Sequence, residues 1–334
     1  MSYTNGLDDP SAYFKVQLYT GDGSANHAIT FDDTDTDMQP DLVWIKNRDA
    51  TDSHCLFDAV RGATKVMHPD TNALEATDAD TLDSFASDGF QVDADVKVNT
   101  NTEKYVAWCW KESATAGFDI LTYTGTGSAT TISHSLSAVP HFLIVKRREA
   151  NGSWLCYHQG IGNTNTILLE ASDAKVDVDI WNDTTPTSSV FSVPSGDDTN
   201  TDTHTYVSYL FAPKQGYSKF GSYEGNNASG TGSADGTFVY LGFRPAYVLI
   251  KAADEASQNW HIFDNKRTTY NVINKRIYAD TNAAETTYTM IDFLSNGFKI
   301  RVQDSAVSAA NTYIYAAFAE APFVNSNGVP CNAR

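Results

Sequence analysis

The chain has 334 residues, of which 41% are hydrophobic, and this is enough for two or three domains with real cores. Its 41 acidic side chains outnumber 23 basic ones, which gives a formal net charge of −18 at pH 7. Such a charge repels the phosphates of nucleic acids and of anionic lipids, so we expect no nucleic-acid partner. No apolar run is long enough for a membrane span, so we expect no membrane insertion.

The first 13 residues are polar and carry neither the basic nor the apolar segment of a secretory signal. A protein that starts in this way is expected to be made in a cytoplasm. A polar leader does not bury itself, so residues 1–13 are predicted to be an N-terminal arm that is disordered alone or docks on a partner.

One strand pattern occurs three times, at residues 40–46, 140–146 and 245–251. Each copy begins with Pro, continues with five residues that are mostly β-branched or aromatic, and ends with Lys. Proline suits the first residue of a strand because it has no N–H to donate, and the run after it fits a buried, pleated surface. The lysine is expected at the solvent edge.

Four other landmarks keep the same order around each copy. They are Tyr-Thr-Gly or Tyr-Glu-Gly at 19–21, 123–125 and 223–225; an apolar strand at 53–58, 153–158 and 259–264; Phe-x-Ser-x-Gly-Phe at 85–90 and 293–298, with a looser match at 189–191; and a closing strand at 105–110, 206–211 and 313–318. Conserved order of five landmarks indicates three divergent copies of a unit of about 100 residues. The predicted boundaries are an arm at 1–13, unit 1 at 14–112, unit 2 at 113–213, unit 3 at 214–323 and a C-terminal tail at 324–334.

Short apolar runs separated by Gly, Asn, Asp, Ser and Thr predict strands throughout, with helical turns at most at 78–84 and 265–269. The predicted fold is all-β, with three tandem antiparallel β-sandwich domains of the jelly-roll, lectin-like type. Both faces of each closing strand are apolar. A neighbouring unit or subunit is therefore expected to cover the second face.

Neither a metal nor a disulfide is indicated. The cysteines Cys55, Cys109, Cys156 and Cys331 show no CxxC pair and no histidine at ligand spacing, so we expect free thiols, with Cys331 as the exposed one. The acidic run 31–37 alternates Asp and Thr as a calcium loop does, but it lacks the Gly and Glu of an EF-hand. A solvated turn is favoured there, calcium binding stays open, and no cofactor is expected.

No catalytic constellation is present. Asp58 and Asp264 occupy equivalent positions, but unit 2 has His158 there, which favours a structural role at the end of a strand. Neither HExxH nor GxSxG occurs, and among so many acidic residues a carboxylate pair of the kind that hydrolyses glycans would arise by coincidence. We therefore expect no enzymatic activity.

The pattern PDLVWIKNRD…LFD.VRG…F.SDGF…YVAWCWK, between Pro40 and Lys111, resembles a repeat of structural proteins of tailed bacteriophages. Many of these phages are marine, and the proteins are often labelled tail fibre or minor virion protein. The resemblance is closest over unit 1 and weakest over unit 2. It implies a virion component, assembled in the host cytoplasm, that is a homotrimer and contacts other virion proteins through its N-terminal arm.

Two functions fit this resemblance. As a tail-fibre adhesin the protein would bind host-surface glycans through the loops that differ between copies, at 180–189 and 226–236. The best candidate is Trp181, whose ring would stack on a sugar while Asp179, Asn182 and Asp183 accept its hydroxyls, although a buried Trp181 is the alternative. As a capsid decoration or tail adaptor the protein would be purely architectural.

Overall fold

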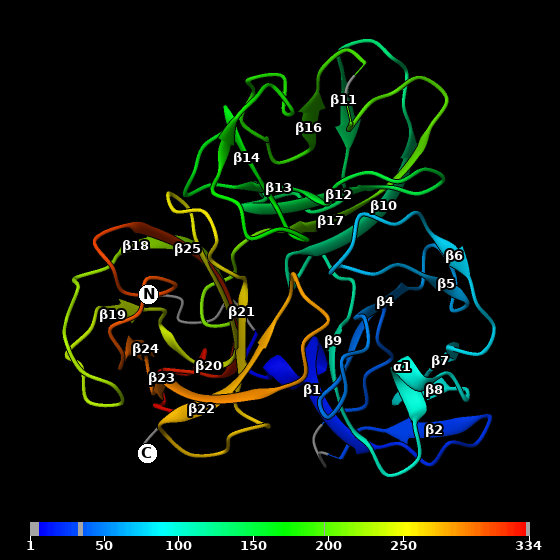
Figure 1. Ribbon diagram of the computed structural model, residues 1–334. Coiled ribbons are helices and arrows are strands. Elements are labelled where there is room, and N and C mark those ends of the chain that lie inside the picture. Colours follow the sequence, from blue (N-terminus) through cyan, green and yellow to red (C-terminus); the bar gives the residue numbers. More distant parts are fainter. Residues whose placement is uncertain (1–6, 33–35, 197, 332–334) are drawn as a thin grey trace.

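The computed structural model describes residues 7–32, 36–196 and 198–331. Within these ranges nearly all regular structure is strand, with one short α-helix and one short 3-10 helix (Figure 1). The N-terminal arm holds η1 (Pro10–Ala12).

Unit 1 consists of β1 (Phe14–Thr20), β2 (His27–Thr30), β3 (Leu42–Asn47), β4 (Cys55–Asp58), β5 (Lys65–Val66), β6 (Ala76–Thr77), β7 (Leu82–Ala86), β8 (Gly89–Val92), α1 (Val96–Asn99) and β9 (Lys104–Trp110). Unit 2 consists of β10 (Phe118–Thr124), β11 (Thr130–Ser133), β12 (Phe142–Arg147), β13 (Leu155–His158), β14 (Asn165–Leu168), β15 (Val176–Asp177), β16 (Val190–Val193) and β17 (Thr205–Phe211). Unit 3 consists of β18 (Ser218–Glu224), β19 (Phe238–Tyr240), β20 (Phe243–Ala252), β21 (His261–Asp264), β22 (Ile273–Tyr278), β23 (Thr286–Leu294), β24 (Gly297–Ile300) and β25 (Thr312–Pro322).

The same four-strand order occurs in each unit: β1-β9-β3-β4, then β10-β17-β12-β13, then β18-β25-β20-β21. All of these pairings are antiparallel, and their registers correspond, because the pairs Leu42 with Trp110, Phe142 with Phe211 and Tyr247 with Phe318 lie directly opposite each other. The three strands that the proline pattern predicted therefore occupy equivalent places. The all-β prediction is confirmed.

The prolines behave in two ways. Pro40 and Pro140 precede their strands, as predicted, but Pro245 is the third residue of β20 and lies at a shift in the register of β20 against β25. A proline inside a strand is tolerated at such an irregularity because no ladder hydrogen bond is required of its nitrogen.

The Gly-Phe landmark marks a close approach between strands. A Cβ on Gly89 would lie 2.0 Å from the carbonyl oxygen of Ile29, and one on Gly297 would lie 2.0 Å from that of Val239. In unit 2 the matching place in the β11–β16 pair holds Val190, opposite Ser133.

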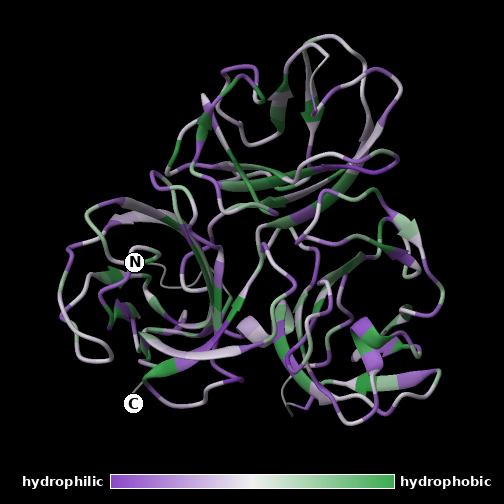
Figure 2. Cartoon of the chain, in the orientation of Figure 1, coloured by the Kyte–Doolittle hydropathy of each residue, from purple (hydrophilic) through white to green (hydrophobic). Residues whose placement is uncertain are grey.

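Four hydrophobic cores fill the molecule. Three of them belong to single units, and the largest combines residues of all three. Figure 2 shows hydrophobic (green) segments along the strands of all three lobes. In β9, Val106, Trp108 and Trp110 enter the shared core, while Tyr105 and Cys109 on the other face enter the core of unit 1.

The three units surround an approximate threefold axis within one chain, visible as three lobes in Figure 1. The last aromatic residues of the closing strands meet there: the ring centroids of Trp110, Phe211 and Phe318 lie 5.6 to 6.4 Å apart in all three pairs. Neighbouring units of the same chain thus cover the second apolar face of each closing strand.

Several local predictions need correction. Residues 7–13 are not a loose arm, because Leu7 is 3% exposed in the shared core and the backbone N–H of Ser326 donates to Asp8 (2.8 Å). Residues 1–6 lie outside the described ranges. Residues 78–84 and 265–269 form turns and strand rather than helix.

The thiols are free as predicted: Cys55, Cys109 and Cys156 are buried, and Cys331 is exposed. Among the residues that the structure describes, no helix is long and apolar enough to cross a membrane.

Candidate functional site

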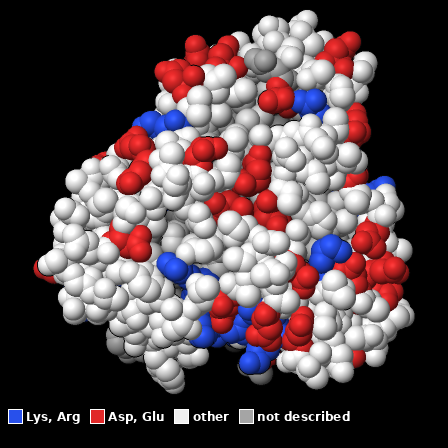
Figure 3. Space-filling view, in the orientation of Figure 1, with Lys and Arg blue, Asp and Glu red and all other residues white. Residues whose placement is uncertain are grey.

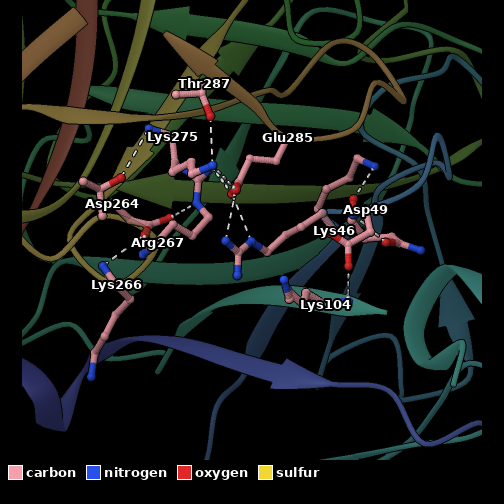
Figure 4. Close-up of polar contacts among 12 residues, drawn as sticks. Lys46, Asp49, Lys104, Asp264, Lys266, Arg267, Lys275, Glu285 and Thr287 are labelled. Carbon is pink, nitrogen blue, oxygen red and sulfur yellow. Dashed lines mark hydrogen bonds and ion pairs between the residues drawn. The ribbon is translucent and has the colours of Figure 1, made fainter. Parts of the chain in front are cut away.

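The junction between units 1 and 3 contains a network of buried charges (Figure 4). Arg48 binds Glu285 through two hydrogen bonds, from Nε (2.9 Å) and Nη2 (3.0 Å). Arg267 donates from Nη1 to the carboxylate of Glu285 (3.3 Å) and from Nε to that of Asp264 (2.5 Å). Asp264 also accepts from Nε1 of Trp108 (3.0 Å). In Figure 3, Lys and Arg side chains gather beside acidic ones where these two lobes meet.

The junction between units 1 and 2 repeats this geometry. Arg148 binds Glu75 through Nε (2.9 Å) and Nη2 (3.0 Å), and Arg61 bridges Glu75 and Asp58 at 3.2 Å and 2.5 Å. Tyr209 takes the place of the tryptophan and donates to Asp58 (2.7 Å). Burial raises the pKa of Glu75, but the hydrogen bonds and charges of the two arginines outweigh it, so the net pKa is lowered.

The junction between units 2 and 3 differs in chemistry. His158 replaces the aspartate and contacts the carbonyl oxygen of Tyr315 through Nε2 (3.1 Å), and Ile161 replaces the bridging arginine. The outer ion pair is reversed in sign, with Lys175 on unit 2 and Asp254 on unit 3 (2.5 Å). All three strand-end residues, Asp58, His158 and Asp264, are buried between units.

The strand-end lysines are not at the solvent edge, which corrects the prediction: Lys46, Lys146 and Lys251 are all 0% exposed. Lys146 donates to the carbonyl oxygens of Gly152 (2.7 Å) and of Asn72 (3.1 Å), which belongs to a loop of unit 1. Lys251 similarly reaches Ser172 of unit 2 (3.1 Å). Burial lowers the pKa of each lysine to about 8.

We expect these lysines to make stability rise with pH above about 8. A lysine with a folded pKa near 8 and an unfolded pKa near 10.5 is protonated more in the unfolded state between those values, so stability is gained as pH rises. The free energy of unfolding of wild type minus that of Lys146→Met should increase between pH 7.5 and 9.5, by on the order of 1 kcal/mol per pH unit. The comparison is needed because the buried cysteines, whose pKa values are raised, titrate with the opposite sign. A difference that stays constant would contradict the expectation.

The cavity between the three units offers no site for a polar ligand. Its volume is about 30 Å³, and apolar side chains of all three units line it, including Trp44, Phe142 and Leu249. The apolar lining offers a water no hydrogen-bond partner.

Exposed aromatic side chains gather instead at one end of unit 3. Tyr270 is 78% exposed, Tyr240 is 55% exposed and Phe323 is 36% exposed. A hollow of about 430 Å³ adjoins Tyr270 and is lined by Arg244, Thr269, Tyr270, Asn271, Phe293, Leu294, Ser295 and Asn296. A second hollow of about 150 Å³ adjoins Tyr240 and Phe323. We call the three aromatic residues and the two hollows the Tyr270 surface.

Hydrogen bonds fix both parts of this surface. The side chain of Asn271 accepts from the backbone N–H of Phe293 (2.8 Å) and donates to its carbonyl oxygen (2.8 Å), so the loop that presents Tyr270 is held against β23. The backbone N–H groups of Leu241 (2.9 Å) and Gly242 (3.1 Å) both donate to the carbonyl oxygen of Asn296, which joins the two hollows.

Of the four residues of the predicted glycan site, the structure buries one and exposes three. Trp181 is 1% exposed, packs edge to face on Tyr157 and donates from Nε1 to the carbonyl oxygen of Asn165 (3.2 Å). It is a core residue, which is the alternative left open above, and its ring has no face available to a sugar. Asp179, Asn182 and Asp183 are exposed, and Asp179 accepts from the N–H of Asp183 (3.0 Å) within the turn.

The acidic runs form no metal centre in the part of the chain that the structure describes, where no three His, Cys, Asp or Glu side chains are grouped. Residues 33–35 of the run 31–37 lie outside the described ranges.

Sequence reasoning overlooked the junction carboxylates Glu75 and Glu285. The signal was present, because Asp-Thr-Asn-Ala-Leu-Glu at 70–75 and Asp-Thr-Asn-Ala-Ala-Glu at 280–285 differ at one position. It also overlooked Tyr270, since a single tyrosine in a polar stretch gives no indication of exposure.

A family model described as a domain of unknown function (DUF7483) matches residues 9–322, and the chain therefore belongs to this family. The single match spans all three units. No curated protein and no solved structure matches the chain.

Proposed function

We propose that this DUF7483 chain is a non-enzymatic component of a bacteriophage virion that binds host-surface glycans through the Tyr270 surface. The phage assignment rests on the resemblance of the repeat between Pro40 and Lys111. The binding role rests on one observation, the 78% exposure of Tyr270 beside a hollow of about 430 Å³. That volume lies within the range of about 300–1,000 Å³ typical of small-molecule sites.

The chemistry of the Tyr270 surface suits a sugar. A flat tyrosine ring presents an apolar face to the C–H groups of a pyranose, while amide and guanidinium groups bind hydroxyls. Asn296 and Arg244 line the hollow, and the guanidinium of Arg244 is held there by Glu320. This assignment moves the proposed glycan site from the turn at 179–183 to unit 3, because the tyrosine is exposed and Trp181 is not.

Replacing Tyr270 with Ala is expected to weaken glycan binding roughly 3- to 10-fold, since an aromatic contact contributes about 0.5–1.5 kcal/mol. The melting temperature should not change, because the side chain is mostly in solvent. Glycan-array screening of the purified protein, followed by calorimetry with the best-bound glycan, would measure this. Val96→Ala, which alters another exposed apolar side chain in unit 1 (55% exposed), is the control. Equal glycan affinities for Tyr270→Ala and Val96→Ala would exclude the Tyr270 surface as the glycan-binding site.

An architectural role as capsid decoration or tail adaptor is the second candidate, and the internal threefold arrangement favours it. One chain with three similar faces can sit on a threefold axis of a larger assembly without forming a trimer itself. The homotrimer remains part of the adhesin proposal, but it would have to use surfaces other than the closing strands. Antibody labelling of virions distinguishes the candidates, since a decoration protein would cover the capsid and an adhesin the tail.

A further inference from the structure

Unit 3 contains a polar pocket at the rim of its core. The pocket has a volume of about 210 Å³ and is lined by Ser257, Gln258, Asn259, His261, Arg276, Tyr278, Asp304 and Ala306. These residues lie at the start of β21 and the end of β22, whereas the Tyr270 surface lies where β20 begins and β23 ends. The pocket is therefore separate from the proposed glycan site.

Two residues make the difference between the units. His261 lies opposite Ile250 in the β20–β21 pair, and the matching positions hold Cys55 opposite Ile45 in unit 1 and Leu155 opposite Val145 in unit 2. Arg276 likewise replaces two buried residues, Val66 of unit 1 and Thr166 of unit 2. Unit 3 therefore carries an imidazole and a guanidinium at the rim of its core, where the other two units have smaller or uncharged side chains.

The imidazole of His261 has an unused polar atom. The side chain is 2% exposed, and within the described part of the chain its Nδ1 has no hydrogen-bond partner. Burial, together with the charges of Arg276 and Lys251, lowers its pKa to about 3, so the ring is neutral at pH 7. Nδ1 is itself shielded from solvent, so a ligand in the pocket does not reach it, and the ring of His261 serves as part of the pocket wall.

The guanidinium of Arg276 is held by neutral groups. Its Cζ lies 5.1 Å from the ring centroid of Tyr278 and 4.7 Å from that of Tyr288. Nε donates to the hydroxyl of Thr286 (3.0 Å), and Nη1 approaches the sulfur of Met290 (3.7 Å). An arginine fixed between aromatic rings, and paired with no carboxylate among the described residues, keeps its charge and its remaining N–H groups for a carboxylate ligand.

We propose that this pocket binds a carboxylate flanked by hydroxyl groups, the chemistry of an acidic monosaccharide. Arg276 takes the carboxylate, and the carboxylate of Asp304 and the amide of Gln258 take hydroxyls. The volume is below the range of about 300–1,000 Å³ for drug-sized ligands, so one sugar residue fits rather than a chain.

The net charge of −18 does not prevent this binding. At physiological ionic strength charges more than about 8 Å apart are largely screened, so the groups inside the pocket decide the affinity. There the positive Arg276 faces the negative Asp304, and the pocket itself is close to neutral. Binding should weaken only modestly when salt is lowered.

The test uses free glucuronic acid as the probe, with glucose as the neutral comparison, titrated into the full-length protein by NMR or calorimetry. We expect a millimolar dissociation constant for glucuronic acid and binding at least 10-fold weaker for glucose. Arg276→Thr introduces the residue of unit 2, so it should fold, and it should weaken glucuronic acid binding 10-fold or more. Lys275→Met, which removes a charge from the same strand outside the pocket, is the control and should bind as wild type does.

Three outcomes would overturn the proposal: no binding of glucuronic acid at tens of millimolar, equal binding of glucose, or wild-type affinity in Arg276→Thr. Titration with gluconic acid distinguishes a requirement for the sugar ring from recognition of any hydroxylated carboxylate. These measurements do not involve Tyr270. Failure of the pocket proposal would therefore leave the glycan-binding role of the Tyr270 surface untouched, and failure of that role would leave the pocket proposal untouched.

Discussion

Replacing Asp58 with Ala is expected to lower the free energy of unfolding by about 3–5 kcal/mol, because it leaves a buried arginine without its main partner. Asp58 and the side chain of Arg61 are both 0% exposed, and Asp58 accepts from Nε of Arg61 (2.5 Å) and from the hydroxyl of Tyr209 (2.7 Å). Chemical denaturation followed by tryptophan fluorescence would measure the loss. A change below 1 kcal/mol would show that solvent reaches this junction.

The chain supplies the matched control. Unit 2 has His158 and Ile161 where unit 1 has Asp58 and Arg61. The double variant Asp58→His with Arg61→Ile removes the guanidinium as well as the carboxylate, so no buried arginine is left without its partner. It should therefore be more stable than Asp58→Ala. Similar stabilities of the two variants would mean that the loss comes from Tyr209 rather than from the buried charge.

Replacing Trp108 with Ala is the second change with a large expected effect, again about 3–5 kcal/mol. The ring is 0% exposed in the shared core, contacts Trp44 and Tyr247 edge to face at 5.9 Å, and donates to Asp264 of unit 3. Its loss creates a cavity between units and removes a hydrogen bond across the junction. Calorimetry should show one transition at a lower temperature, because the shared core joins the three units.

Trp108→Tyr is the control, since unit 2 has Tyr209 at this position and its hydroxyl reaches an equivalent aspartate. This variant should keep most of the stability. If Trp108→Ala instead split the transition, so that unit 1 melted separately, the units would be more independent than the shared core implies.

Much of the fold could be predicted because the signals are local. The alternation in Tyr105 to Trp110 assigns the closing strand and shows that both of its faces are apolar, and repetition of the landmarks assigns the same strand in each unit. The candidate site could not be predicted in this way. Trp181 and Tyr270 both stand among polar residues, and only packing against Tyr157 or projection into solvent separates a core ring from an exposed one.

Local patterns were sufficient to predict that the chain is all-β, that one strand pattern recurs three times and that the closing strands need a second partner, because strand periodicity depends on neighbours within a few residues. That this partner is the rest of the same chain, and that Lys46, Lys146 and Lys251 are buried, follows from the packing of the units. A lysine at the end of an apolar run is normally hydrated. Here loops of neighbouring units place carbonyl oxygens around Lys146 and Lys251, and such contacts join residues about 80 positions apart, where no sequence pattern reports them.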